Sequence, residues 1–212
     1  MAFDVDGTLY PNSAVYLRAL PFALRNLPNI RAFSRIRKEI RKIRPLADFY
    51  QTQAKLFAAR RNIGVQAAGN IIDRLFYGKW NAVIRKARLF PRVRETLLRL
   101  KAAGLKLAAL SDFPLANKLE VWGIDEVWDY RKSCEQIGYL KPNPEPFLDV
   151  MGFFGVSPEE ILYVGNNYAY DIVGAKNQGF MAAHLTRHAP PGSVADFSFT
   201  DFRRLGDWIL GK

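Results

Sequence analysis

The chain has 212 residues, of which 49% are hydrophobic, so it can bury a substantial core and does not have the composition of a disordered protein. Its single cysteine, Cys134, excludes an internal disulfide framework, and no apolar run approaches the roughly 18–20 residues of a membrane span. Lysine and arginine outnumber aspartate and glutamate by 31 to 20, a formal net charge of +11, which favours anionic partners without choosing among phosphorylated substrates, nucleic acid and acidic membranes.

The chain begins with a short apolar stretch, "FDVDGTLY" (Phe3–Tyr10), which predicts a buried strand that ends at a turn around Gly7. Three residues precede Asp4, whereas a buried strand usually has about five. We therefore expect either an unusually short first strand or a natural N-terminus upstream of Met1. The opening "MAFDVDG" is acidic where a signal peptide would be basic, so we expect a cytoplasmic protein.

The next stretch, residues 13–86, is predicted to be entirely helical. Within Arg31–Arg44 the apolar residues Phe33, Ile36, Ile40 and Ile43 follow each other at spacings of 3, 4 and 3, which is one narrow helical stripe. The segments "ADFYQTQAKLFAARR" and "VQAAGNIIDRLFYGKW" predict further helices. We expect a helical cap domain at 13–86, inserted into an α/β core domain that comprises 1–12 and 87–212.

This predicted cap is strongly basic near its start. From Arg18 to Arg44 there are nine lysines and arginines and one acid, Glu39. One interpretation is a solvated helix face; the other is a surface that attracts an anionic substrate or, as a weaker alternative, makes peripheral contact with an anionic membrane. We expect no nucleic-acid partner.

From about Leu89 onward, helical and strand-like patterns alternate. Helices are predicted at 91–104, where Val93, Leu97, Leu98 and Leu100 share a helical spacing, and at 114–124, 143–155 and 171–179. Strands are predicted at 105–110, 126–130, 161–164 and 180–186, and a last strand and helix at 195–210. This alternation predicts an α/β fold with a doubly wound, Rossmann-like parallel sheet that has helices on both faces.

Two carboxylates, Asp4 and Asp6, follow the first predicted strand, at the edge of the sheet where α/β proteins place their reactive groups. Carboxylates this close raise each other's pKa and titrate together, so one can act as nucleophile or metal ligand while the other carries a proton as general acid. The alternative is a turn that uses aspartate for local hydrogen bonds.

Other polar residues are predicted to reach the same edge. "LAALSD" brings Ser111, "GYLKPNPEPF" brings Lys141, and "ILYVGNNYAYD" brings Asn166, Asn167 and Asp171. Hydroxyl and ammonium groups suit phosphate oxygens, and ligands that are all oxygen suit Mg²⁺.

These segments resemble the four motifs of the haloacid dehalogenase-like hydrolase superfamily, in particular its phosphoglycolate phosphatase-like branch with a helical cap. "DVDGTL" matches the first motif at every position, "LSD" the second, "SCEQIGYLKPNPEPF" the third and "VGNNYAYDIVGAKNQG" the fourth. The resemblance covers nearly the whole chain, with the motifs in order.

The resemblance implies a role for each matching residue. Asp4 would attack phosphorus and carry an aspartyl-phosphate, and Asp6 would protonate the leaving oxygen and then deprotonate water. Ser111, Asp112 and Lys141 would bind the phosphoryl group. Asp4, the main-chain carbonyl of Asp6, Asn166 and Asp171 would hold Mg²⁺. The expected activity is therefore Mg²⁺-dependent hydrolysis of a small phosphorylated metabolite.

Two alternatives stay open at this point: a phosphomutase, which shares the motifs, and a catalytically degenerate module that binds a phosphorylated ligand or an anionic surface. The second rests on Asn166, since close relatives carry aspartate there. Asp6 argues against dehalogenation, because the dehalogenases of the superfamily lack this second acid and halide departure needs no proton donor.

Overall fold

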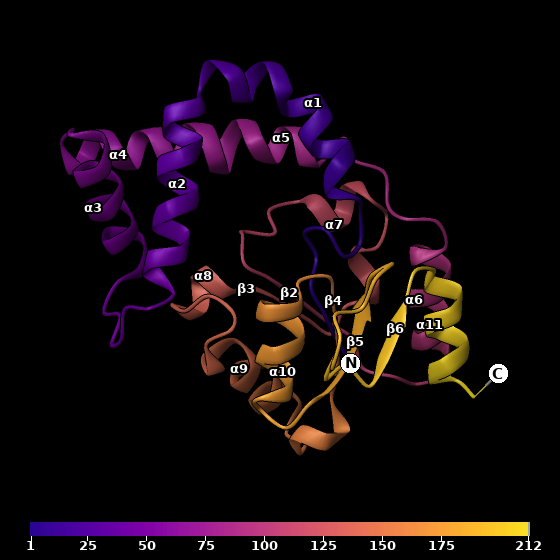
Figure 1. The fold of residues 1–212 in the computed structure, drawn as a ribbon. Coiled ribbons are helices and arrows are strands. Elements are labelled where there is room, and N and C mark those ends of the chain that lie inside the picture. The colour runs from indigo at the N-terminus through magenta and orange to yellow at the C-terminus, as the bar shows by residue number, and fades with distance from the viewer. Residues whose placement is uncertain (212) are drawn as a thin grey trace.

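The structure, a computed structural model, describes residues 1–211, apart from the side chain of Ala14. In this part of the chain, six parallel strands form one sheet in the order β3-β2-β1-β4-β5-β6 (Figure 1). The strands are β1 (Ala2–Phe3), β2 (Ala108–Ser111), β3 (Tyr130–Ser133), β4 (Leu162–Gly165), β5 (Met181–Leu185) and β6 (Phe197–Phe199). The predicted doubly wound α/β fold is confirmed.

The first strand is short, in line with the first of the two expectations above, and it lies at the centre of the sheet. Phe3 pairs with Ala109 of β2 on one side and with Val164 of β4 on the other. The Asp4 N–H donates to the Val164 carbonyl over 2.8 Å, so pairing with β4 extends beyond the strand itself. The loop after β1 therefore leaves the sheet between its two halves, where α/β proteins bind ligands.

Helices cover both faces of the sheet because successive strand residues point to opposite sides. Phe3 and Val164 face the layer that contains α6 (Val93–Ala102) and α11 (Phe202–Ile209). Ala2 and Tyr163 face the layer that contains α9 (Pro144–Phe154) and α10 (Val173–Lys176). The remaining core helices are α7 (Lys118–Val121), α8 (Cys134–Ile137), η2 (Asp125–Val127), η3 (Pro158–Glu160) and η4 (Tyr168–Ile172).

Three sequence expectations for the core were wrong in detail. The helix predicted at 114–124 is reduced to α7, because Ala116 has a φ of 46°, which no right-handed helix accommodates. The strand predicted at 126–130 begins only at Tyr130, because Asp125–Val127 form the short helix η2. Leu98 of α6 is exposed, whereas the other residues of its predicted stripe are buried.

Residues 13–86 contain helices and no strand, as predicted, with irregular connections at 41–48 and 62–64, and form a separate layer above the sheet (Figure 1). Their helices are α1 (Asn12–Arg25), α2 (Leu27–Ile40), α3 (Phe49–Arg61), α4 (Val65–Ile72), η1 (Asp73–Trp80) and α5 (Asn81–Ile84). The last three run on without a break, because the backbone at their junctions stays right-handed helical. We propose 13–86 as the cap domain and 1–12 with 87–212 as the core domain.

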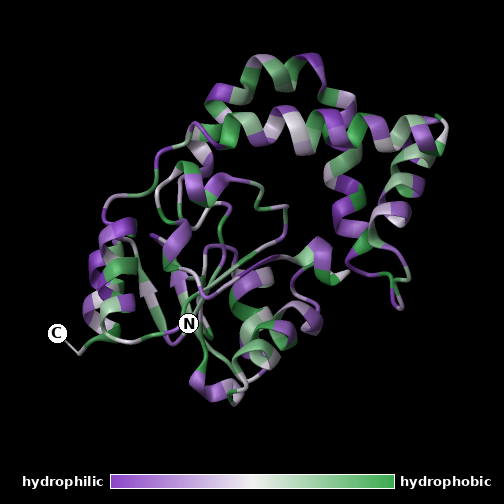
Figure 2. Cartoon of the chain, turned by 180° about the vertical axis from the view of Figure 1, so that it is seen from behind, coloured by the Kyte–Doolittle hydropathy of each residue, from purple (hydrophilic) through white to green (hydrophobic). Residues whose placement is uncertain are grey.

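The cap has its own apolar core, in which residues of α2, α3, α4 and η1 pack together. Figure 2 shows hydrophobic and hydrophilic residues alternating along these helices, as amphipathic packing requires. The helix predicted over Arg31–Arg44 belongs to α2 and ends earlier, at Ile40. Within residues 1–211 no helix is both long enough and apolar enough to cross a membrane.

Candidate active site

The loop after β1 places Asp4 and Asp6 in different surroundings although one residue separates them. Gly7 makes the turn with a φ of 94°, in the region that favours glycine. A Cβ at this position would lie 2.3 Å from the Asn12 side chain and 2.7 Å from that of Asn166. Glycine is therefore required here both by the backbone conformation and by the closeness of its neighbours.

Asp4 lies in a buried cluster with Lys141 and Asp171. Lys141 Nζ donates to Asp4 Oδ1 over 2.8 Å, to Asp171 Oδ1 over 2.6 Å and to the Tyr163 hydroxyl over 3.0 Å. All three charged side chains are almost fully buried. Burial raises the pKa of Asp4 to about 7, although Lys141 opposes the rise. Burial alone would lower the pKa of Lys141, but Asp171 and Asp4 hold it well above its usual value.

Asp6 has a second lysine of its own, Lys118. Lys118 Nζ lies 3.0 and 3.2 Å from the two carboxylate oxygens, and its side chain is fully buried. The hydroxyls of Ser111 and Tyr10 each donate to Asp6 over 2.5 Å. Burial would raise the pKa of Asp6, but Lys118 and these hydrogen bonds outweigh it and hold the pKa below its usual value.

The fourth motif lies beside this cluster. The Asp171 carboxylate also accepts the Asn167 N–H over 2.9 Å, and Gly165 permits this approach, since a Cβ there would lie 2.3 Å from that of Asp171. Thr8 Oγ1 lies 2.7 Å from Asp4 Oδ2 and 3.2 Å from Asn166 Oδ1, so it joins the first motif to the fourth. Asp4, Asn166 and Asp171 are thus brought together as expected.

The oxygens of this cluster suit a hard cation. Two buried carboxylates contact one ammonium, and an amide oxygen lies nearby, so the donors are all oxygen and carry net negative charge. Between residues 1 and 211, no three histidine, cysteine or acidic side chains are grouped as a ready-made metal site. A cation here would therefore rely on two carboxylates supplemented by amide or main-chain oxygens.

The second motif contributes two side chains, Ser111 and Asp112. The Ser111 hydroxyl could contact a ligand only after it turns away from Asp6, and the Asp112 carboxylate is already engaged. Ser111 Oγ donates to Asp6 and accepts the Phe113 N–H over 3.0 Å. The Asp112 carboxylate accepts the Lys141 N–H over 3.1 Å and forms an ion pair with Arg41. The Asp112 carboxylate is therefore not available to bind a phosphate. The main-chain N–H of Asp112 is the group of this residue that could do so.

The sequence argument gave three residues at this edge no role in the site: Lys118, Thr8 and Tyr163. Thr8 lies inside the first motif, where its hydroxyl was the available signal. Tyr163 lies on β4 with its ring buried, and its apolar neighbours in the sequence make it look like an ordinary core residue. Lys118 lies 112 positions from Asp6, and nothing in its local sequence separates it from a lysine exposed to solvent.

The basic stretch of the cap is not uniformly solvated. Arg37 is buried, pairs with Glu135 of the core and donates to the Asp112 carbonyl over 2.6 Å. Arg41 pairs with Asp112, donates to the Lys141 carbonyl over 2.7 Å and lies 4.2 Å from the ring centre of Tyr170. These two arginines therefore tie the cap to the segments that carry the second and third motifs.

Replacing Glu135 by glutamine should destabilise the protein by about 3 kcal/mol, because Arg37 would keep its buried charge without a counter-ion. The matched control is Glu145→Gln, since Glu145 pairs with Arg44 at the surface, and it should cost less than about 1 kcal/mol. Urea denaturation of both variants checks this. Equal losses would show that the Arg37–Glu135 pair does not hold the cap to the core.

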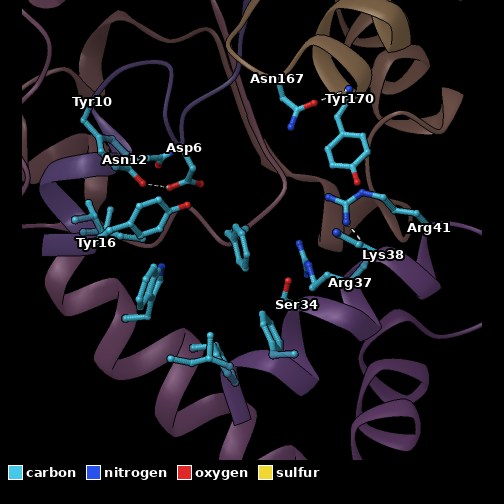
Figure 3. Close-up of a pocket in the computed structure, with 17 residues that line it drawn as sticks. Asp6, Tyr10, Asn12, Tyr16, Ser34, Arg37, Lys38, Arg41, Asn167 and Tyr170 are labelled. Carbon is cyan, nitrogen blue, oxygen red and sulfur yellow. Dashed lines mark hydrogen bonds between the residues drawn. The ribbon is translucent and has the colours of Figure 1, made fainter. Parts of the chain in front are cut away.

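A cavity of about 550 Å³ lies between the cap and this edge of the sheet. Figure 3 shows Asp6, Tyr10 and Tyr16 on one side of it and Arg37, Arg41 and Tyr170 on the other. Asp6 is thus the acid that faces the cavity, whereas Asp4 lies deeper beside Lys141. A molecule in the cavity would meet Asp6 before the rest of the site.

Comparison with known proteins identifies the family and the fold. Residues 1–179 match the family described as haloacid dehalogenase-like hydrolases. The fold is shared with the crystal structure of a HAD phosphatase from Thermococcus onnurineus, at a TM-score of 0.71 and 23% identity, covering 99% of this chain and 96% of that one.

Three curated relatives carry different activities in their names. A glyceraldehyde 3-phosphate phosphatase from Methanopyrus kandleri is 27% identical over 87% of this chain and 82% of its own length. A phosphoglycolate phosphatase from Mannheimia succiniciproducens is 34% identical, but the match spans only 56% of each chain. An (S)-2-haloacid dehalogenase from Burkholderia cepacia is 31% identical over 68% of this chain and 62% of its own.

Proposed function

The chain belongs to the haloacid dehalogenase-like hydrolase family, and from this premise we propose that it is a Mg²⁺-dependent phosphatase that hydrolyses a phosphorylated metabolite through a phosphorylated Asp4. Relatives named as phosphatases support the reaction class. Because another relative is named as a dehalogenase, phosphate ester hydrolysis has first to be distinguished from dehalogenation.

The observation that carries the proposal is the second acid, Asp6, held by three donors in the wall of the cavity. A carboxylate that displaces halide needs no proton donor, because halide is a stable leaving group. An alkoxide leaving group does need one. A buried acid fixed by a lysine, two residues after the nucleophile, has a purpose in phosphate ester hydrolysis and none in dehalogenation.

In the first step an Asp4 carboxylate oxygen forms a bond to phosphorus, and the bond from phosphorus to the ester oxygen breaks. The departing oxygen takes a proton from Asp6. The approach of an anionic ester raises the pKa of a neighbouring carboxylate, which favours the uptake of that proton by Asp6 beforehand.

In the second step Asp6, now ionised, accepts a proton from water as the water oxygen attacks phosphorus. The bond between phosphorus and the Asp4 oxygen breaks, which releases inorganic phosphate and restores the free carboxylate. Lys118 and the hydrogen bonds to Asp6 hold its pKa below the usual value, which keeps it in the ionised form that this step needs. We propose that Lys141, the Ser111 hydroxyl and the Asp112 N–H hold the phosphoryl oxygens, with Ser111 turning away from Asp6 to do so.

The groups that would hold Mg²⁺ are the side chains of Asp4, Asp171 and Asn166 and the main-chain carbonyl of Asp6. When bound, the ion supplies positive charge that offsets repulsion between the Asp4 carboxylate and the phosphoryl group. Lys141 supplies part of the same charge from the chain itself, since it contacts both Asp4 and Asp171.

A panel of phosphate esters, assayed for released phosphate with Mg²⁺ and with EDTA, tests the proposal. Release that needs Mg²⁺ supports it. Ester binding without release would favour a non-catalytic module, and transfer of the phosphoryl group between two positions of a sugar would favour a mutase. Release of chloride from 2-chloropropionate, with no phosphate release from any ester, would assign the chain to dehalogenation.

Asn166→Asp should tighten Mg²⁺ binding several-fold, because the substitution adds a negative charge beside Asp4 and Asp171. Titration calorimetry of the unliganded protein with MgCl₂ measures the affinity directly, and the Mg²⁺ concentration for half-maximal phosphate release should fall in parallel. Asn167→Asp is the matched control, because the Asn167 side chain accepts the Tyr170 N–H instead of approaching Thr8. Unchanged affinity in Asn166→Asp would remove residue 166 from the metal site.

A further inference from the structure

The cavity between cap and core, here named the cap cavity, has a wall that is mostly aromatic and aliphatic. Seven of its seventeen lining residues are aromatic, among them Tyr16, Trp80 and Phe113, and three more are aliphatic (Figure 3). Its volume of about 550 Å³ lies within the roughly 300–1,000 Å³ of pockets that enclose drug-sized ligands.

The charged groups of the cap cavity are mostly committed elsewhere. Arg37 pairs with Glu135, and Arg41 pairs with Asp112, so neither guanidinium is available to neutralise a substrate. Asn167 already accepts the Tyr170 N–H. Lys38, Ser34 and Asn12 also line the cavity and could meet a few polar groups, but an alcohol with many hydroxyls would face mostly apolar side chains and regain few of its hydrogen bonds to water.

The aromatic groups that remain half-buried or exposed lie where a ring could contact them. Tyr16 and Trp80, from α1 and η1, have ring centres 6.2 Å apart, and Tyr16 is 59% exposed. Phe113 follows β2 directly after Asp112 and is half-buried. Cap and core thus both contribute an aromatic face to the same space that Asp6 borders.

On the basis of the phosphatase function proposed above, we propose that the substrate is a phosphate monoester whose alcohol carries an apolar ring, which lies among Tyr16, Trp80 and Phe113 while its ester oxygen meets Asp6. Aromatic faces bind planar rings through dispersion and through edge-to-face or offset contacts. Burial of such a ring provides binding that a two- or three-carbon alcohol cannot obtain here.

Two esters of equal chemical reactivity test this: 2-phenylethyl phosphate and ethyl phosphate. Both are primary alkyl esters with leaving groups of similar basicity, so a difference in kcat/KM reports the contact with the ring. We expect 2-phenylethyl phosphate to be favoured by about 10- to 100-fold, the factor that burial of an aromatic ring confers. 2-Phosphoglycolate, small and anionic, should be used no better than ethyl phosphate.

The Trp80→Ala variant should lower the ratio of kcat/KM for the phenylethyl ester to kcat/KM for the ethyl ester by about 10-fold. Trp208→Ala is the matched control, since Trp208 is on α11, where it stacks on Phe197, and does not line the cap cavity. It should change neither ester. Binding of both esters to Asp4→Asn, measured by calorimetry, tests the cavity in the absence of turnover.

These readouts separate the two proposals. If phosphate is released but ethyl phosphate or 2-phosphoglycolate is used as well as the phenylethyl ester, the ring site is overturned and the phosphatase stands. If no ester releases phosphate while Asp4→Asn binds the phenylethyl ester more tightly than the ethyl ester, the ring site stands and the phosphatase is overturned. Equal binding of the two esters together with no release overturns both.

Discussion

Replacing Asp4 by asparagine should abolish phosphate release, with a loss of about 10⁴-fold or more in kcat. An amide nitrogen or oxygen does not act as the nucleophile that a carboxylate is, and no neighbouring group can substitute for it. Asp171 is already engaged by Lys141 and by the Asn167 N–H, and Asp6 by three donors. The assay is phosphate release from the best ester of the panel, at saturating Mg²⁺.

The same substitution should leave the fold at least as stable, and the effect should depend on pH. Burial raises the pKa of Asp4 to about 7, above the unfolded value of about 4, so the native state binds more protons than the unfolded state between these pH values. Stability from this group therefore falls as pH rises from about 4 to 7. Asparagine removes that penalty, so the variant should gain most over wild type near pH 7.

Urea denaturation in EDTA at pH 5 and pH 7.5 measures this difference. Lys141 keeps a buried partner in the variant, because Asp171 remains 2.6 Å from it. If the variant is much less stable than wild type at pH 7.5, Asp4 is mainly a structural partner of Lys141. The loss of activity would then no longer identify Asp4 as the nucleophile.

Three of the residues that sequence analysis brought together share one physical property: each lies at the carboxyl end of a strand of the parallel sheet. Asp4, Ser111 and Asn166 must meet at one edge wherever their strands pair side by side, and β2, β1 and β4 do. Local patterns were enough for this prediction, because runs of apolar residues and the glycines that follow them mark where strands end and turns begin. The short β1 followed from the same kind of local count.

What the sequence could not predict depends on pairs far apart in the chain. Arg37 could not be separated from the other basic residues of the cap because its partner, Glu135, lies 98 positions away. The cap cavity similarly needs the relative placement of α1, η1 and the loop after β2, which no periodicity encodes. The helix predicted at 114–124 was wrong because Ala116 adopts a left-handed backbone conformation, which alanine disfavours.

Lys118 is the residue of greatest consequence among those the sequence did not single out, and Lys118→Met should impair both stability and catalysis. The substitution keeps the length of the side chain but leaves Asp6, at the edge of a buried site, without its ammonium partner. Removing one member of a buried pair costs about 3 kcal/mol, which urea denaturation would detect. Asp6 should also lose the orientation that two oxygens facing one ammonium impose.

The catalytic effect should depend on the leaving group. An aryl phosphate needs little proton donation to its departing oxygen, whereas an alkyl phosphate needs much, so Lys118→Met and Asp6→Asn should each slow alkyl esters by about 10²-fold or more and aryl esters by clearly less. Tyr10 and Ser111 remain as donors to Asp6 in the Lys118 variant, so its loss should be the smaller of the two.

A double-mutant cycle decides whether the two residues act as a unit. Asp6→Asn combined with Lys118→Met removes both charges, so the double variant should be more stable than the sum of the two single losses predicts, by about 1–3 kcal/mol. On alkyl esters the double variant should be no slower than Asp6→Asn alone, because Lys118 acts only through Asp6. If the losses in stability and in rate are both additive, Lys118 has an independent role, such as direct contact with the phosphoryl group. The role of Asp6 as acid would then lose its support, because that role rests on the geometry that Lys118 fixes.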